Sequence, residues 1–179
     1  MDPYEKYREI HNSEKKGIMD NYEKYREFTI SRNWEGICSI NGVELDSFGT
    51  KKELGVLPTY LEEGEVVFAL TSGIVSQTKT SNATDFGPNT WLVTLTNERF
   101  LFLDCAMLSS SVDIQSARHE YIQAVSASQG WMYGKISVDL GNRMIVIDNC
   151  KKETVNIMAK LANQWVRELK EKKAQAQQQ

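Results

Sequence analysis

The clearest pattern of hydrophobic and polar positions lies between residues 66 and 149, where short apolar or alternating runs are separated by turns. Arg99–Leu103 is apolar at every position after the arginine, as expected of a strand buried on both faces. Only Asn97 and Glu98 separate it from the alternating run before it, which predicts a tight hairpin. The predicted strands are Val66–Val75, Trp91–Thr96, Arg99–Leu103, Ser111–Ile114, Tyr121–Ala127, Lys135–Leu140 and Arg143–Ile147. Short strands at this spacing are typical of an antiparallel barrel or sandwich.

A helical pattern follows the strands. Between Lys152 and Lys172 the apolar residues recur three and four positions apart and share one face. They are Met158, Leu161, Ala162, Trp165, Val166 and Leu169. The pattern predicts an amphipathic helix over residues 152–172 that seals one end of the barrel. Residues 173–179 have nothing to bury and are predicted to be a disordered tail.

Two different segments precede the strands. Thr50-Lys-Lys-Glu53 has the form of a capping box, in which the hydroxyl and the carboxylate satisfy backbone amides at a helix start. It predicts a short lead-in helix over residues 50–62 that Pro58 kinks or limits to two turns. Residues 34–49 contain three glycines and are expected to form a connector.

The N-terminal residues 1–33 contain a repeat and are predicted to be a helical appendage. The hexapeptide YEKYRE begins at Tyr4 and again at Tyr22, 18 residues later, which is about five helical turns. Tyr7 and Tyr25 occupy the matching fourth positions. The four tyrosines either form a face that binds a partner or a second copy of the chain, or pack on the chain's own domain. One helix and a helical hairpin both fit the repeat.

Composition narrows the class of protein. The chain is 41% hydrophobic and 25% charged with a net charge of −3, values that suit a globular domain and argue against a nucleic-acid coat. No apolar run approaches the roughly 20 residues that cross a bilayer. The charged N-terminus lacks the apolar core of a secretory signal, so a cytoplasmic location is expected. Cys38, Cys105 and Cys150 are widely spaced and are expected to be reduced thiols without a zinc site.

The chemistry of an enzyme is not evident in the sequence. The two histidines are His11 and His119, and the Cys–His couple that Cys105 and His119 suggest has no third group to orient it. A histidine in this position is more often on the surface. We therefore predict no catalytic residues, no metal and no cofactor, and a hydrolase or nuclease site near His119 is a remote alternative.

One segment resembles a known family. Residues 89–104 read NTWLVTLTNERFLFLD, which resembles strands two and three of bacterial pleckstrin-homology (PH) domains of the YokE-like group. Those have an apolar strand, then Thr-Asn-Lys-Arg, then an apolar strand ending in Asp; Glu98 departs from the pattern. Residues 48–54, 57–65, 122–126 and 130–136 are similar to other parts of these domains. The resemblance implies a mainly β fold with α-helices (α+β), a seven-stranded PH-like barrel over residues 48–172, and no enzymatic activity.

The expected function is therefore that of a non-catalytic interaction or scaffold module that binds a protein partner or a second copy of the chain. Phe86, Trp131 and Tyr133 lie on predicted loops, where they either anchor a partner or fold back over the core. A peripheral membrane-lipid adaptor is the alternative and requires a basic patch near Lys79 and Lys135. The first loop of the barrel offers Lys79 alone, which argues against a specific phosphoinositide site.

Overall fold

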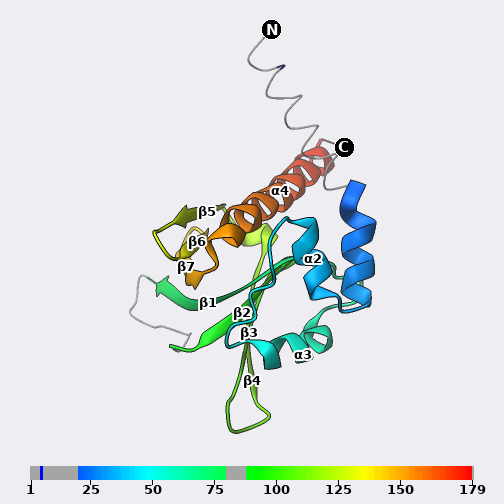
Figure 1. Cartoon of the computed structure of the whole chain (residues 1–179). Helices are drawn as coiled ribbons and strands as arrows, with labels where there is room; N and C mark the ends of the chain where they lie inside the picture. Colours follow the sequence, from blue (N-terminus) through cyan, green and yellow to red (C-terminus); the bar gives the residue numbers. More distant parts are fainter. Residues whose placement is uncertain (1–4, 6–19, 80–87, 179) are drawn as a thin grey trace.

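The protein is seen in a computed structural model that describes residue 5 and residues 20–79 and 88–178, with the side chains of residues 78 and 79 excepted. The seven strands are β1 (Val67–Lys79), β2 (Thr90–Thr96), β3 (Arg99–Cys105), β4 (Val112–Arg118), β5 (Ala124–Gln129), β6 (Gly134–Asp139) and β7 (Arg143–Cys150). They form one antiparallel sheet in the order β4-β3-β2-β1-β7-β6-β5 (Figure 1). The predicted seven-stranded fold with a C-terminal helix is confirmed.

The long strand β1 belongs to both halves of the sheet. Its first part pairs with β2 and its second part with β7, and Ile74 faces both Thr90 and Asp148. At this corner the two halves come very close together. A Cβ atom on Gly73 would lie 2.7 Å from Cγ2 of Ile147, closer than real contacts allow. Only glycine therefore permits the sheet to fold over on itself here.

The central strands β2 and β3 are buried on both faces, as predicted for Arg99–Leu103. One face points into the barrel, and helix α3 (Lys51–Tyr60) packs on the other. The predicted capping box is wrong, because the Thr50 hydroxyl makes no capping hydrogen bond and lies 2.6 Å from Oγ of Ser72. The Glu53 carboxylate instead accepts a hydrogen bond from the backbone N–H of Cys105. Helix α3 is thereby attached to the sheet by polar contacts as well as by its apolar face.

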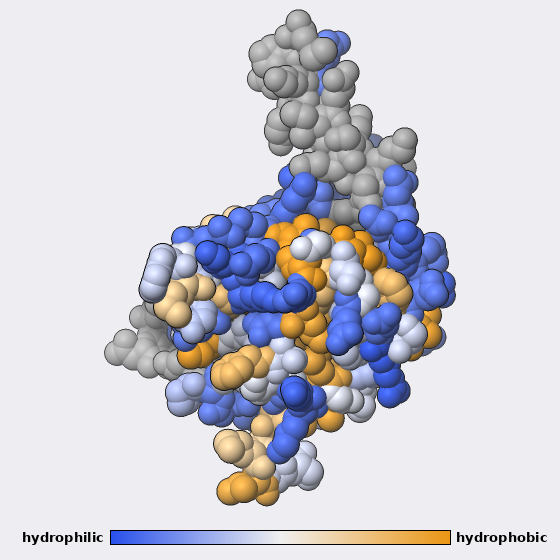
Figure 2. All heavy atoms as spheres, in the orientation of Figure 1, coloured by the Kyte–Doolittle hydropathy of each residue, from blue (hydrophilic) through white to orange (hydrophobic). Residues whose placement is uncertain are grey.

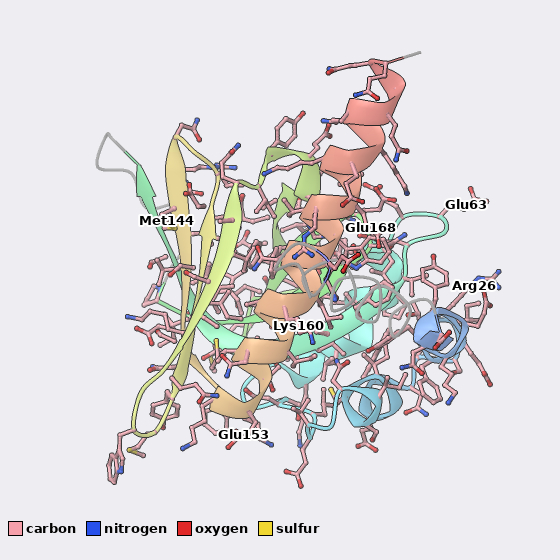
Figure 3. The ribbon with its side chains drawn as sticks, turned by 90° about the horizontal axis from the view of Figure 1, so that it is seen from above. Arg26, Glu63, Met144, Glu153, Lys160 and Glu168 are labelled. Atoms are coloured by element: carbon pink, nitrogen blue, oxygen red, sulfur yellow. The ribbon has the colours of Figure 1, made fainter. Side chains whose placement is uncertain are left out.

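The C-terminal helix α4 (Lys152–Ala176) crosses β5, β6 and β1 (Figure 3). Its stripe, including Met158 and Ala162, is buried against the sheet. The side chain of Asn163 accepts a hydrogen bond from N of Val125 (3.0 Å) and donates one to its O (2.6 Å). This amide takes the place of a neighbouring strand and closes the edge of β5. The helix continues to Ala176, so residues 173–176 are helical and are not part of a disordered tail.

The N-terminal part of the described chain packs on the barrel as two helices. Residues 20–30 form one, and α2 (Trp34–Ile40) forms the other, so the first half of the predicted connector is helical. Asn33 caps α2 by accepting a hydrogen bond from N of Gly36. A further difference is that Tyr121 belongs to the 3-10 turn η1 (His119–Tyr121), and the strand predicted from Tyr121 begins at Ala124.

The tyrosines of the second repeat lie on the chain's own domain. Tyr25 is buried, and its ring centroid is 4.7 Å from that of Phe68; the distance from Tyr22 to Phe68 is 5.8 Å. Burial raises the pKa of Tyr25 to about 12. These contacts favour the second of the two hypotheses for this repeat, because a buried ring has no surface to offer a partner. Tyr4 and Tyr7 of the first repeat lie outside the described residues.

Candidate interaction surface

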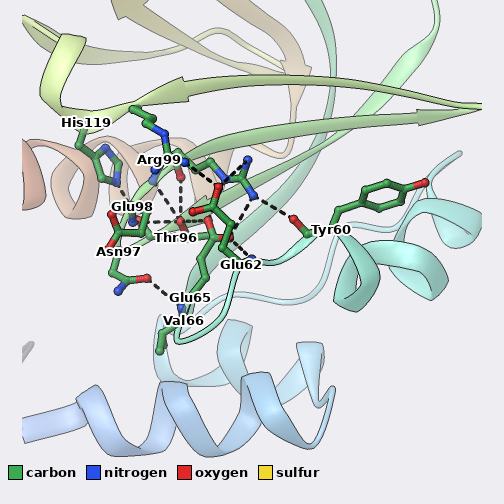
Figure 4. Close-up of polar contacts among 10 residues, drawn as sticks. Tyr60, Glu62, Glu65, Val66, Thr96, Asn97, Glu98, Arg99 and His119 are labelled. Atoms are coloured by element: carbon green, nitrogen blue, oxygen red, sulfur yellow. Dashed lines mark hydrogen bonds and ion pairs between the residues drawn. The ribbon is translucent and has the colours of Figure 1, made fainter.

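The Thr-Asn-Glu-Arg turn between β2 and β3 builds a buried polar cluster (Figure 4). Arg99 donates from Nε to Oε1 of Glu65 (3.0 Å) and from Nη2 to Oε2 (3.1 Å). The Thr96 hydroxyl donates to the same carboxylate at 2.6 Å, and Asn97 Oδ1 accepts from N of Val66 at 2.8 Å. Burial alone would raise the pKa of Glu65, but the hydrogen bonds from Arg99 and Thr96 outweigh it and lower this pKa. The motif therefore joins the two residues before β1 to the β2–β3 hairpin and is structural.

His119 lies beside this cluster and is buried, so the expected surface position is wrong. Its Nε2 is 2.8 Å from the backbone O of Thr96, and burial lowers the pKa of the imidazole. Cys105 is at the far end of β3, six residues from Arg99, or about 20 Å along a strand. The Cys105–His119 couple is therefore not assembled.

The other thiols are equally unsuited to nucleophilic chemistry. Burial raises the pKa of Cys38 to about 11 and that of Cys150 to about 12. Burial, with Glu53 nearby, also raises the pKa of Cys105. Within residues 20–79 and 88–178, no three His, Cys, Asp or Glu side chains gather where they could hold a metal ion.

We expect His119 to make the protein less stable in mild acid. Its folded-state pKa lies below the ordinary 6.5, so its stabilisation is complete above pH 6.5 and is lost as pH falls below that value towards the folded pKa. In that range the free energy of unfolding should fall by up to about 1.4 kcal/mol per pH unit. Urea unfolding between pH 7.5 and 5 measures this slope. His119→Gln should flatten it and His11→Gln should not; equal slopes in all three proteins would contradict the assignment.

Large apolar side chains are exposed at three turns and loops. They are Phe48, Met107, Leu108, Trp131, Met132 and Tyr133, which are 85, 88, 100, 90, 58 and 52% exposed. We call these six residues the apolar rim. They come from the loop before α3, the tip of the β3–β4 hairpin and the β5–β6 turn. The tip of the hairpin projects at the bottom of Figure 1, and its surface is coloured as hydrophobic in Figure 2.

Two hollows connect the three segments of the apolar rim. The corner hollow, about 460 Å³, is lined by Phe48, Ile74, Met132 and Tyr133 among others. The hairpin hollow, about 770 Å³, is lined by Phe48 and Met107 among others. Because Phe48 borders both, the loop before α3 links the other two segments. Exposed apolar side chains that gather beside hollows in this way typically mark a binding site.

The backbone beneath the apolar rim is held by hydrogen bonds. Lys52 Nζ donates to the backbone O of Met107 at 3.1 Å, which attaches the hairpin tip to α3. The N–H of Gly130 donates to the backbone O of Tyr133 at 2.8 Å across the β5–β6 turn. The Ser72 hydroxyl donates to the backbone O of Asp46 at 2.9 Å. A surface fixed in this way loses less conformational entropy when it binds.

The charges around the hollows are of both signs. Lys51, Lys52, Lys151 and Lys152 line them, together with Asp46, Glu53 and Glu153. Lys151 is 3.1 Å from a carboxylate oxygen of Glu44, and Lys135 is 3.4 Å from one of Asp148. The basic patch that a lipid adaptor requires near Lys135 is thus partly neutralised. The side chain of Lys79, like the whole of Phe86, lies outside the described residues.

Part of this surface could be predicted from the sequence. Trp131 and Tyr133 were expected on a loop, and both are exposed instead of folding over the core. Phe48, Met107 and Leu108 were not predicted. The available signal was a single large apolar residue among turn formers, as in Ser47-Phe48-Gly49.

Comparisons with known proteins agree with this fold. A family model described as Bacterial PH domain matches residues 61–164. None of the curated proteins matches the chain. Among its described residues the protein has no helix with the length and apolar character needed to cross a membrane.

Several solved PH domains are similar in structure but distant in sequence. The Vps36 N-terminal PH domain is 12% identical with a TM-score of 0.46, over 61% of this chain and 84% of that one. The PH domain of USP37 is 10% identical with a TM-score of 0.41, over 55% of this chain and 97% of that one. A PH domain from Shewanella amazonensis SB2B is 14% identical with a TM-score of 0.34, over 55% of this chain and 80% of that one.

Proposed function

Because this chain belongs to the bacterial PH domain family, we propose that it is a non-catalytic binding module that holds a protein partner at the apolar rim. PH-like domains are typically binding or scaffold modules. The observation that carries the proposal is the exposure of Phe48, Leu108 and Trp131, each at least 85%, on backbone held by hydrogen bonds. The proposed module extends over residues 48–172. Membership of the YokE-like group and a cytoplasmic location are finer parts of the same proposal.

The energetic argument rests on the size of these side chains. Burying one large apolar side chain contributes about 1.5–3 kcal/mol. The binding energy of protein interfaces is concentrated in a few such anchors, with tryptophan prominent among them. The hollows beside Phe48 add concave surface between the projecting side chains, where a partner can insert its own. The partner is another protein or a second copy of this chain.

A peripheral lipid adaptor is the second candidate. Lys51, Lys52, Lys151 and Lys152 border the hollows, and lysines beside exposed aromatic residues also suit an anionic membrane surface. Asp46 and Glu153 line the corner hollow, and Glu44 pairs with Lys151, so the positive charge there is partly offset. We favour the protein partner for this reason.

The test is a triple variant with Phe48→Ser, Leu108→Ser and Trp131→Ser. These side chains are at least 85% exposed, so the fold should be unaffected. Quantitative affinity capture from native lysate should identify proteins that the natural chain retains and the variant does not. With the purified partner, affinity should fall by about 100-fold or more, as expected when two or three anchors are lost.

Ile30→Ser is the matched control, because Ile30 is 70% exposed on the helix of residues 20–30, away from the apolar rim. It should keep the natural affinity. Equal capture by the natural chain and the triple variant would overturn the proposal. Sedimentation with phosphatidylglycerol-containing vesicles, abolished by salt and unaccompanied by protein capture, would replace it with the lipid adaptor.

A further inference from the structure

Strand β4 is the outer strand on one side of the sheet, and β3 is its only neighbour there. All seven residues of β4 pair with β3 in a continuous register. Residues 113–116 are exposed. On the other side of the sheet, the Asn163 amide closes the edge of β5. The fold thus protects one edge and leaves the opposite one open to solvent.

The hydrogen bonds at the two ends of β4 show which of its backbone groups point outward. The N–H of His119 donates to O of Glu98 at 3.1 Å. The N–H of Ala106 donates to O of Ser111 at 3.0 Å. Since backbone groups alternate in direction along an antiparallel strand, the odd-numbered residues of β4 bond to β3 and the even-numbered ones point away from it. The even-numbered residues are Val112, Ile114, Ser116 and Arg118.

These outward N–H and C=O groups form a row that a further strand can pair with. In the part of the chain that the structure describes, no hydrogen bond is made by the backbone of Val112, Ile114 or Ser116 on this side. The side chains of Val112 and Ile114 lie on the face that α3 covers, because Val112 is opposite Cys105, whose side chain contacts Glu53 of α3. Val112 is half-buried and Ile114 is 43% exposed, so an added strand gains apolar contacts on this face.

The other face of β4 favours a cation. Asp113 lies directly opposite Asp104 in the pairing of β4 with β3. Like charges in this arrangement repel each other. A lysine or arginine in the strand that adds beside Asp113 would offset this repulsion. The edge therefore suits an extended segment in which apolar and basic residues alternate.

We propose that an extended segment of the protein partner adds to the free edge of β4 as a further antiparallel strand, with apolar residues opposite Val112 and Ile114 and a basic residue opposite Asp113. The inference rests on the proposed function, since β4 leads directly from the hairpin tip that carries Met107 and Leu108 (Figure 1). It specifies the conformation in which the partner continues from the apolar rim.

The first test uses two synthetic peptides with the full-length chain. Both have the sequence acetyl-Thr-Val-Lys-Val-Lys-Val-Thr-amide, and one is N-methylated at its valines and the other at its lysines. The valines opposite Val112 and Ile114 make the backbone hydrogen bonds, so only methylation of the valines should block pairing. In ¹⁵N-labelled protein, the lysine-methylated peptide should shift the amide signals of Val112, Ile114 and Ser116 in a saturable way and slow their hydrogen exchange.

The valine-methylated peptide should bind at least about tenfold more weakly, as expected when several backbone hydrogen bonds are lost. Equal binding of the two peptides, or no saturable shift along β4, would overturn the inference.

The second test changes the edge itself. Ile114→Pro removes an outward N–H without removing a bond to β3, a change that edge strands tolerate. It should weaken the lysine-methylated peptide at least about tenfold. Ile114→Thr is the matched control, because it keeps the N–H and the β-branched shape, and it should weaken the peptide less than about fivefold. Equal losses in the two variants would mean that the side chain binds and the backbone does not, and the inference would be wrong.

The peptide comparison needs only the natural chain, so it decides even if Ile114→Pro does not fold. Light scattering that shows a stable dimer, with the Ile114 amide protected before any peptide is added, would assign the edge to a second copy of the chain and overturn the inference.

The two proposals can fail separately. If the triple variant loses its partner but Ile114→Pro keeps it, the apolar rim binds without an added strand and only this inference is wrong. If the two peptides bind as expected but the triple variant keeps its partner, the edge of β4 is a strand-binding site and the proposed function is wrong.

Discussion

Replacing Arg99 with methionine should lower the free energy of unfolding by about 3–5 kcal/mol, the range expected when one partner of a buried ion pair is removed. The Glu65 side chain is 0% exposed, and Arg99 supplies two hydrogen bonds to it. Without the guanidinium, the carboxylate is left buried with only Thr96 and the N–H of Glu62 as donors. Urea denaturation at pH 7 measures the loss.

The pH dependence gives this prediction a second readout. The folded-state pKa of Glu65 lies below the ordinary 4.5, so its stabilisation is complete above pH 4.5 and is lost as pH falls through the folded pKa. In Arg99→Met the carboxyl is protonated more readily, and the difference in stability from the natural chain should shrink as pH falls. Arg26→Met is the control, because Arg26 forms an exposed 3.5 Å pair with Glu23 and should cost less than about 1 kcal/mol. A comparable loss in both variants would contradict the role of Arg99.

The same cluster shows why much of the fold could be predicted from the sequence. The β2–β3 hairpin depends on local features: two apolar runs and the two-residue turn of Asn97 and Glu98. The α4 stripe is also local, because its spacing alone fixes which residues face the sheet. In the hairpin and in α4 the local sequence pattern and the tertiary contacts favour the same structure. Both elements were predicted for this reason.

Elements that depend on tertiary contacts were predicted less well. Strand β4 extends to Arg118, four residues beyond the predicted end at Ile114, although Gln115 and Ser116 are exposed and polar. It is a strand because it pairs with β3 along its length, from Val112 opposite Cys105 to Arg118 opposite Arg99. Helix α2 was missed because its glycine at position 36 weakens the helical pattern, whereas the Asn33 cap stabilises its start.

The candidate site was the least predictable part. The hydrophobicity of a side chain indicates that it should be buried, but it does not indicate which surface buries it. Tyr25 and Tyr133 are the same residue type, yet Tyr25 is 4% exposed and Tyr133 is 52% exposed. Tyr25 lies on a helix packed against β1, whereas Tyr133 lies in a turn beyond the end of β5. Likewise, Glu53 was predicted to cap its own helix, and only the packing of α3 on β3 brings it to the hairpin hollow.

The second large effect is expected at Phe68, where Phe68→Ala should lower the free energy of unfolding by about 3–5 kcal/mol. The side chain is fully buried, and pairing of β1 with β2 skips Phe68 between Val67 and Ala69. Its ring contacts three others, Tyr22, Tyr25 and Trp165, at centroid distances of 5.8, 4.7 and 5.1 Å. One side chain thus joins the helix of residues 20–30, strand β1 and helix α4.

The position of Phe68 between three elements predicts a local loss of stability in addition to the global one. Hydrogen exchange in Phe68→Ala should accelerate first in residues 20–30, whose buried contacts with the barrel include the Tyr25–Phe68 ring pair beside the hydrogen bond from N of Val67 to the Thr29 hydroxyl. Tyr22→Ala removes a half-buried ring at the edge of the same cluster and should cost about 1 kcal/mol. Uniform acceleration across the barrel and residues 20–30 would contradict the idea that Phe68 holds this helix in place. An unchanged exchange rate in residues 20–30 would mean that the contacts of α2 with β1 suffice to hold the N-terminal helices.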